Sequence, residues 1–172
     1  MKRLDKIPFN KLIWLIPIVY LLHELEEWYI FEWWSNVFPD SAPLPEFAGR
    51  VWLLASSAFG FILIGLFSYF MNPKTVAISS LILASLPFAN GLQHLYWLFY
   101  FSTYTPGVIF ASFIGIPVTI YIAWRAISEN LIKKRFILLL LIFPIYIFHE
   151  VIMAGDQVPN SMKILIEFIS SF

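Results

Sequence analysis

Residues 21–28 read Leu-Leu-His-Glu-Leu-Glu-Glu-Trp, and this stretch lies at the end of an otherwise apolar run. The run, from residue 12 onward, has the length and apolar character of a membrane-spanning helix. Four ionisable side chains at its end are unusual, because charge is unfavourable where water is scarce. The stretch therefore predicts a polar site inside a membrane protein.

The composition of the whole chain also indicates a membrane protein. Of its 172 residues, 60% are hydrophobic and only 13% are charged, whereas soluble domains carry about 25% charged residues. The formal net charge is zero, so no basic surface indicates a nucleic-acid partner. The chain has no cysteine, which excludes disulfides, thiolate nucleophiles and cysteine-type zinc sites. Any bound metal would be held by histidine, carboxylate or amide groups.

Several segments reach the length of about 20 apolar residues that a bilayer span needs. We expect transmembrane helices at about 12–31, 51–71, 75–101, 106–126 and 136–154. A mildly amphipathic tail, 159–172, would lie along a surface. The predicted fold is an all-α, polytopic bundle of five transmembrane helices that forms one domain, residues 1–172.

The distribution of basic residues predicts the orientation of this bundle. With five spans, the N-terminus and the loops after the second and fourth helices share one side. They carry nine of the eleven Lys and Arg residues, which leaves only Arg50 and Lys163 on the other side. Cytoplasmic loops carry the excess of positive charge. We therefore expect a multi-pass protein of the cell membrane with a cytoplasmic N-terminus and its C-terminus outside.

Histidines on three predicted helices fall at one depth. The first, third and fifth helices run in the same direction and carry His23, His94 and His149 past their midpoints. At a rise of about 1.5 Å per residue, these side chains lie at a similar height in the outer half of the membrane. Each histidine also follows a proline on its own helix, and three kinks there would open a cavity. We expect one site lined by all three helices.

Helical spacing on the first helix predicts which side chains face that site. His23, Glu26 and Glu27 stand at i, i+3 and i+4 and share a helix face. Glu24 is rotated by about 100° from His23. We therefore expect Glu26 and Glu27 to face the site and Glu24 to turn away.

Candidate roles follow from the chemistry of these side chains. The candidate metal ligands are three histidines and one carboxylate: His23, Glu27, His94 and His149. The candidate catalytic residues are Glu26, Glu27 and Asn90. The sequence does not decide whether four further polar residues belong to the site: Glu24, Arg50, Glu150 and Asp156.

The residue pattern allows several functions. A mixed histidine and carboxylate set suits zinc or non-haem iron, which would activate water, or oxygen in the case of iron. Without a metal, one carboxyl group would protonate an apolar substrate and a second group would remove a proton, as in a lipid isomerase. The same residues could also relay metal ions or protons in a transporter. A purely structural role explains the carboxylates poorly, because interhelical hydrogen bonds stabilise by only about 0.6 kcal/mol, and a buried acid costs about 2.5–3.5 kcal/mol.

The motif residues also resemble a known family. The stretches are His23-Glu24-Leu25-Glu26-Glu27, Asn90-Gly91-Leu92-Gln93-His94 and Pro106-Gly107. They are similar to the HXXEE-domain family of small bacterial integral membrane proteins, over nearly the whole chain. The resemblance implies that five residues belong to the site: His23, Glu26, Glu27, Asn90 and His94. It implies no particular reaction.

The sequence as a whole predicts a membrane metalloenzyme. We expect a hydrolase or oxidoreductase that uses a divalent metal, zinc or iron, on a lipid or other apolar substrate from the bilayer. The expected partners are membrane lipids and that substrate, with no nucleic acid. The alternatives are the metal-free isomerase and the transporter. The sequence predicts neither the substrate nor the oligomeric state.

Overall fold

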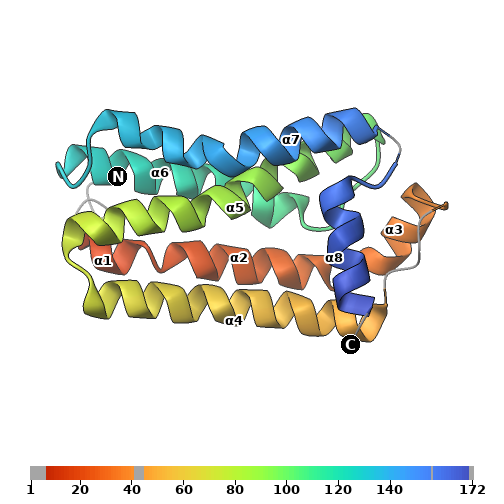
Figure 1. The fold of residues 1–172 in the computed structure, drawn as a ribbon, viewed down its shortest axis with the longest axis horizontal. Helices are drawn as coiled ribbons and strands as arrows, with labels where there is room; N and C mark the ends of the chain where they lie inside the picture. The colour runs from red at the N-terminus through yellow and green to blue at the C-terminus, as the bar shows by residue number, and fades with distance from the viewer. Residues whose placement is uncertain (1–6, 41–44, 156, 171–172) are drawn as a thin grey trace.

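A computed structural model describes residues 7–40, 45–155 and 157–170, and within them the chain is helical and contains no strand. The elements are α1 Phe9–Leu12, α2 Leu15–Glu26, η2 Glu27–Tyr29, α3 Ile30–Val37, α4 Glu46–Phe70, α5 Pro73–Tyr100, η3 Ile109–Gly115, α6 Ile116–Ser128, η4 Lys134–Leu141, α7 Ile142–Ala154 and α8 Asn160–Ser170. The long helices lie side by side along one axis, and α8 crosses one end of the bundle (Figure 1).

Four helices in the described residues are long and apolar enough to cross a membrane. They are Glu46–Phe70, Pro73–Tyr100, Ile109–Ser128 and Lys134–Ala154. These correspond to the second to fifth predicted spans, with ends that differ by a few residues. The chain therefore has the architecture of a helical membrane protein.

The prediction of five spans is wrong at the first segment, 12–31. This segment is divided into α1, α2 and the 3₁₀ turn η2, so no continuous helix of spanning length forms there. Pro17 explains one break, because its nitrogen has no hydrogen to donate to the carbonyl of Ile13, four residues earlier. The helix is interrupted at that place, Ile13 and Trp14. The segment still runs the length of the bundle (Figure 1).

The helices α2 and α5 lie in the middle of the bundle. α2 packs against α4, α5 and η3, and α5 also packs against α6, η4 and α7. The two hydrophobic core clusters lie toward opposite ends of the bundle. One includes Leu12, Leu81 and Ile122, and the other includes Trp34 and Trp97. His23 and His94 come from the parts of α2 and α5 between these clusters.

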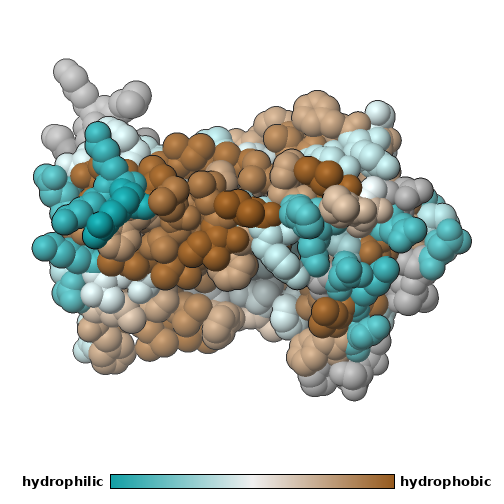
Figure 2. All heavy atoms as spheres, turned by 45° about the horizontal axis from the view of Figure 1, so that its top comes forward, coloured by the Kyte–Doolittle hydropathy of each residue, from teal (hydrophilic) through white to brown (hydrophobic). Residues whose placement is uncertain are grey.

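The surface carries an apolar band. Figure 2 shows hydrophobic residues over the middle of one face and hydrophilic residues toward both ends. Large apolar side chains such as Phe59, Ile62 and Ile145 are exposed in the described structure. Such a band is typical of a protein surrounded by lipid. The orientation in the membrane, with the N-terminus inside, stays a prediction, and its basic residues Lys2, Arg3 and Lys6 lie outside the described residues.

Candidate metal centre

Two histidines and one glutamate form a buried cluster between the two central helices. His23 comes from α2, Glu27 begins η2, and His94 comes from α5. Each offers one ligand atom, and the three atoms lie within 4.8 Å of one another. Their exposed fractions are 1%, 8% and 1%. Among the described residues this is the one group of three or more His, Asp or Glu side chains with such geometry.

Glu27 is the residue that joins the two histidines. Its Oε1 lies 2.9 Å from Nε2 of His94, and its Oε2 lies 3.6 Å from Nε2 of His23. The two imidazole rings meet edge to face, with centroids 5.0 Å apart. Two ligands of a tetrahedral zinc ion are separated by about 3.3 Å when their bonds are about 2.0–2.1 Å long. Of the two distances from Glu27 to the histidine nitrogens, one is shorter than this value and the other is longer.

The orientation of His23 is set by two hydrogen bonds. Its Nδ1 lies 3.2 Å from the carbonyl oxygen of Gly107, so Nδ1 carries the proton and donates it. Nε2 then presents a lone pair, which accepts a bond of 2.9 Å from the Asn90 amide nitrogen. Histidines that bind metals usually donate their other ring N–H to a carbonyl or carboxylate in this way. The Asn90 amide would have to release Nε2 when that atom binds a metal.

Gly107 forms the wall of the cluster on the side of the α5–η3 loop. Its φ is +95°, and a Cβ built on it would lie 2.6 Å from Cε1 of His23 and 2.9 Å from Cγ of Glu27. Only glycine allows both this conformation and this approach. Gly107 is a site residue beyond the candidates named from the sequence, where the Pro106-Gly107 pair is the signal that points to it.

The residues present fit a divalent metal. Two histidines and one glutamate are the protein ligands of one type of catalytic zinc site, and a two-histidine, one-carboxylate set also binds non-haem iron. Both arrangements keep a coordination position open for water or substrate. His94 presents Nε2 to the cluster, and its Nδ1 is buried without a hydrogen-bond partner among the described residues.

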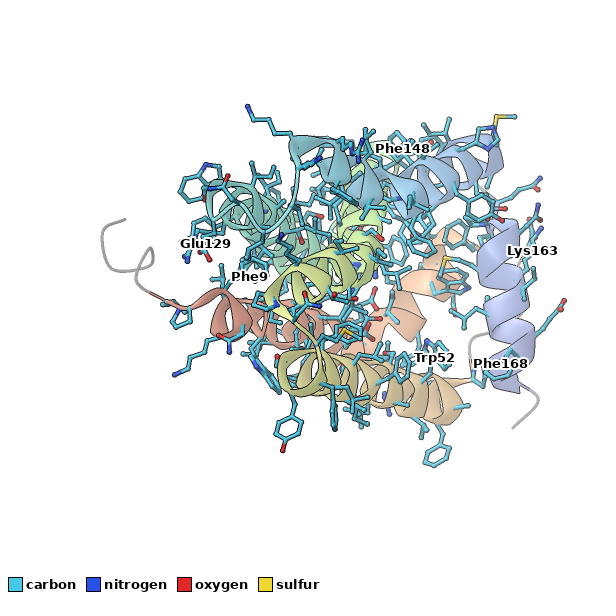
Figure 3. All side chains as sticks on the ribbon, turned by 60° about the vertical axis from the view of Figure 1, so that its left-hand side comes forward. Phe9, Trp52, Glu129, Phe148, Lys163 and Phe168 are labelled. Carbon is cyan, nitrogen blue, oxygen red and sulfur yellow. The ribbon has the colours of Figure 1, made fainter. Side chains whose placement is uncertain are left out.

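The cluster borders a cavity of about 460 Å³. Its polar wall includes Tyr20, Glu24, Glu27, Asn90, Gln93 and His94. Its apolar wall includes Phe31, Trp34, Trp52 and Trp97. Met162 and Leu165 of α8 line it as well, and near that helix Trp52 faces Phe168 with ring centroids 6.0 Å apart (Figure 3).

The prediction that Glu24 turns away from the site is wrong. Its side chain is only 3% exposed and lines the cavity together with Glu27. Oε2 of Glu24 is buried and has no hydrogen-bond partner among the described residues. The cavity therefore contains a second carboxylate that takes no part in the cluster of three.

Glu26 does not face the cluster as predicted, and instead holds the loop that covers it. Its carboxylate accepts hydrogen bonds from the backbone N–H groups of Ile109 and Phe110, at 3.1 and 2.9 Å. The Tyr104 hydroxyl donates to the same carboxylate. Burial and the neighbouring Glu26 raise the pKa of Tyr104 to about 12, so this phenol keeps its proton. A carboxylate at the start of a helix is favoured by the free N–H groups there.

The structure does not bring His149 to the cluster. Its side chain is exposed, although α7 packs directly against α5. The predicted depth along the helix says nothing about rotation around the helix axis, and the apolar surroundings of His149 in the sequence carry no rotational signal. His23, Glu27 and His94 are the predicted ligands that the structure places together.

The structure also shows the partners of two of the polar residues that the sequence could not assign to the site, Arg50 and Glu150. Arg50 pairs with Glu46 at 3.2 Å, and its guanidinium lies 5.3 Å from the centre of the Trp28 ring. Glu150 accepts a bond of 3.0 Å from the Tyr146 hydroxyl. Asp156 lies outside the described residues.

The fold and the site together define a class: a helical membrane protein with a buried cluster of two histidines and one carboxylate. The chain belongs to the family described as proteins of unknown function with an HXXEE motif, whose model matches residues 14–122. This confirms the resemblance noted from the sequence. The matched segment contains all three residues of the cluster, Asn90 and Gly107, and ends before His149. No curated protein and no solved structure matches the chain.

Proposed function

We propose that this protein is an integral membrane metalloenzyme that binds one divalent metal, zinc or iron, at His23, Glu27 and His94. It would act as a hydrolase or oxidoreductase on a lipid or other apolar substrate. The observation that carries the proposal is the placement of a His–Glu–His set against a largely apolar cavity of about 460 Å³. Pockets that bind small molecules have this size and this combination of apolar walls with a few polar groups.

The protein's own residues supply distinct parts of the chemistry. When bound, the metal would activate water, or oxygen in the case of iron, and polarise a substrate oxygen. Glu27 and His94 line the cavity, so a substrate bound there would lie against two of the residues that would hold the metal. Glu24 lines the same cavity with one carboxylate oxygen unpaired among the described residues, which suits a group that accepts or delivers a proton.

Asn90 is the residue that we expect to change partners when a metal binds. Its amide nitrogen now occupies the lone pair of His23 Nε2. Released from that bond, the amide would still line the cavity and could hydrogen-bond the substrate. Asn90 would then orient the substrate, and it remains in the proposal as a catalytic candidate.

A metal-free lipid isomerase is the second candidate function. It is favoured by the two glutamates that face one cavity, Glu24 and Glu27, since one can give a proton while the other takes one. The indole rings in the cavity wall would stabilise a carbocation between them by cation–π contact. A transporter is less well supported, because the bundle end near Leu81 and Ile122 is filled by an apolar core cluster.

The proposal also includes a location. Four candidate spans and the apolar band support a multi-pass protein of the cell membrane. We propose that the N-terminus is cytoplasmic, because most basic residues lie at that end of the helices. The cluster would then lie in the outer half of the bilayer. Membrane lipids and an apolar substrate would be its partners, and no basic surface suggests nucleic acid.

Metal analysis of the purified protein tests the function. We expect near-stoichiometric zinc or iron in the wild type and its loss in the His23→Ala, His94→Ala double variant. His149→Ala is the matched control and should keep the metal, because His149 is exposed. A wild type that binds no metal even when zinc or iron is added would contradict the metalloenzyme and favour the isomerase.

A further inference from the structure

A second cavity lies beside the main one, between α2, α4 and α5. Its volume is about 350 Å³. Its walls include Ile16, Pro17, Phe59, Gly60, Leu83 and Pro87. No ionisable side chain other than the Tyr20 phenol lines it among the described residues. We call this cavity the side groove.

The side groove adjoins the main cavity. Tyr20, Trp52 and Leu86 line both of them. Each volume lies in the range of about 300–1,000 Å³ that single small-molecule ligands occupy. One elongated ligand can therefore have one end at Glu27 and His94 and its other end in the side groove.

The rim of the side groove faces the membrane. Phe59 is 59% exposed and Leu86 is 44% exposed, and they belong to α4 and α5, both of which are candidate spans. The α4 side of the groove is lined by small side chains, which leave room for a ligand: Ala55, Ser56 and Gly60. The hydroxyl of Ser56 is occupied by the carbonyl of Leu53, at 2.9 Å. An apolar chain from the bilayer can enter here without burying an unpaired polar group.

The charges of the main cavity restrict the polar end of such a ligand. Glu24 and Glu27 line it, and no Lys or Arg does among the described residues. A phosphate or carboxylate headgroup would find no cationic side chain to pair with, and the charge of a divalent metal held at Glu27 would already be offset by the two glutamates. A hydroxyl, ester or other uncharged head can hydrogen-bond to Asn90 or Gln93 instead.

We propose that the ligand of this site is an uncharged amphiphile with one long apolar chain. The chain lies in the side groove between α2, α4 and α5, and the head passes Tyr20 and Trp52 to reach Glu24, Glu27 and His94. What happens to the head rests on the proposed function. The position of the ligand's apolar chain in the side groove does not depend on that function.

Two glycines on α4 provide a variant and its control. A Cβ on Gly60 would lie 3.6 Å from Cβ of Pro17, so a larger side chain there extends along the wall of the side groove. A Cβ on Gly65 would lie 3.7 Å from Cη2 of Trp14, and Gly65 lines neither cavity. Gly60→Leu should fill the side groove, whereas Gly65→Leu should place the same bulk outside it.

The test uses a sixteen-carbon alcohol with a diazirine in the middle of its chain. Wild-type protein in detergent is irradiated with the probe, and the labelled peptides are identified by mass spectrometry. We expect labelling on α4 and α5 that unlabelled sixteen-carbon alcohol displaces and six-carbon alcohol does not. Labelling should fall about tenfold in Gly60→Leu, because the side chain overpacks the groove, and should be unchanged in Gly65→Leu.

Several outcomes would overturn the proposal. Equal labelling of both variants, or labelling spread over all lipid-facing helices, would show that the probe binds as bulk lipid. Displacement by the sixteen-carbon carboxylate as strong as by the alcohol would refute the uncharged head. Metal content is measured on the same samples, and Gly60→Leu should keep the wild-type value. Displaceable labelling without any metal would leave the chain site standing and remove the proposed metal chemistry.

Discussion

Glu27 is the residue on which the cluster depends most. Among the described residues it is the acidic side chain placed between His23 and His94, and it lies near each Nε2 with a different oxygen. Its negative charge attracts a cation and its two oxygens position the imidazoles. Removing that charge while keeping the shape of the side chain therefore separates metal binding from packing.

We predict that Glu27→Gln weakens metal binding by at least about 100-fold, since it replaces a direct ligand, whereas changes of outer partners typically cost 10–100-fold. Titration with Co²⁺, followed by its visible absorption, measures the effect. Glu32→Gln is the control, because Glu32 is exposed on α3. Unchanged Co²⁺ binding in Glu27→Gln would show that the carboxylate is not a ligand.

Gly107 is the second residue whose substitution should change metal binding. In Gly107→Ala the added methyl group would collide with His23 and Glu27, and the alanine backbone would have to keep a positive φ. Gly155 also has a positive φ, +59°, but its Cβ would approach only the Tyr100 hydroxyl, at 3.3 Å. We predict that both alanine variants lose about 1–3 kcal/mol of stability from backbone strain. Only Gly107→Ala should also lose Co²⁺ affinity, and equal Co²⁺ affinity in the two would contradict the role of Gly107 as the cluster wall.

At the scale of elements, Glu26 connects α2 to the start of η3. It accepts the backbone N–H groups of Ile109 and Phe110, and the same loop carries the Gly107 carbonyl that orients His23. The HXXEE motif therefore contributes its two final glutamates differently. Glu27 belongs to the cluster, and Glu26 holds the loop against it.

We predict that Glu26→Gln lowers stability by about 1 kcal/mol, as the loss of a helix-capping charge does. The variant should still bind one metal, with reduced affinity, because the loop is less firmly placed. Thermal unfolding in detergent with and without Co²⁺ measures both effects. Complete loss of the metal in Glu26→Gln would place this carboxylate among the ligands after all.

The elements show how far the sequence could predict the structure. The four long helices were predictable, because an apolar run of spanning length has few alternatives in a membrane. The division of the first segment is not predictable from hydropathy, because the backbone effect of Pro17 does not change the apolar character of its neighbours. Helical spacing gives the angles of Glu24 and Glu26 around α2, but it does not show that a cavity lies beside Glu24 or that the start of η3 lies beside Glu26, because both depend on tertiary packing.

At the scale of the whole molecule, the site lies between two core clusters. The sequence could predict that His23 and His94 meet, because topology and depth both placed them at one level. It could not exclude His149, because rotation about the axis of α7 depends on packing that an evenly apolar helix does not encode. The two cavities depend on side-chain packing among α2, α4 and α5, which only the three-dimensional structure supplies.

The central claim is that two histidines from two helices and one glutamate hold the metal. X-ray absorption at the edge of the bound zinc or iron counts the imidazoles around the ion most directly. We predict two imidazoles per metal in the wild type and in His149→Ala, and a loss of bound metal or of one imidazole in His94→Ala. Three imidazoles in the wild type, or an unchanged spectrum in His94→Ala, would contradict it.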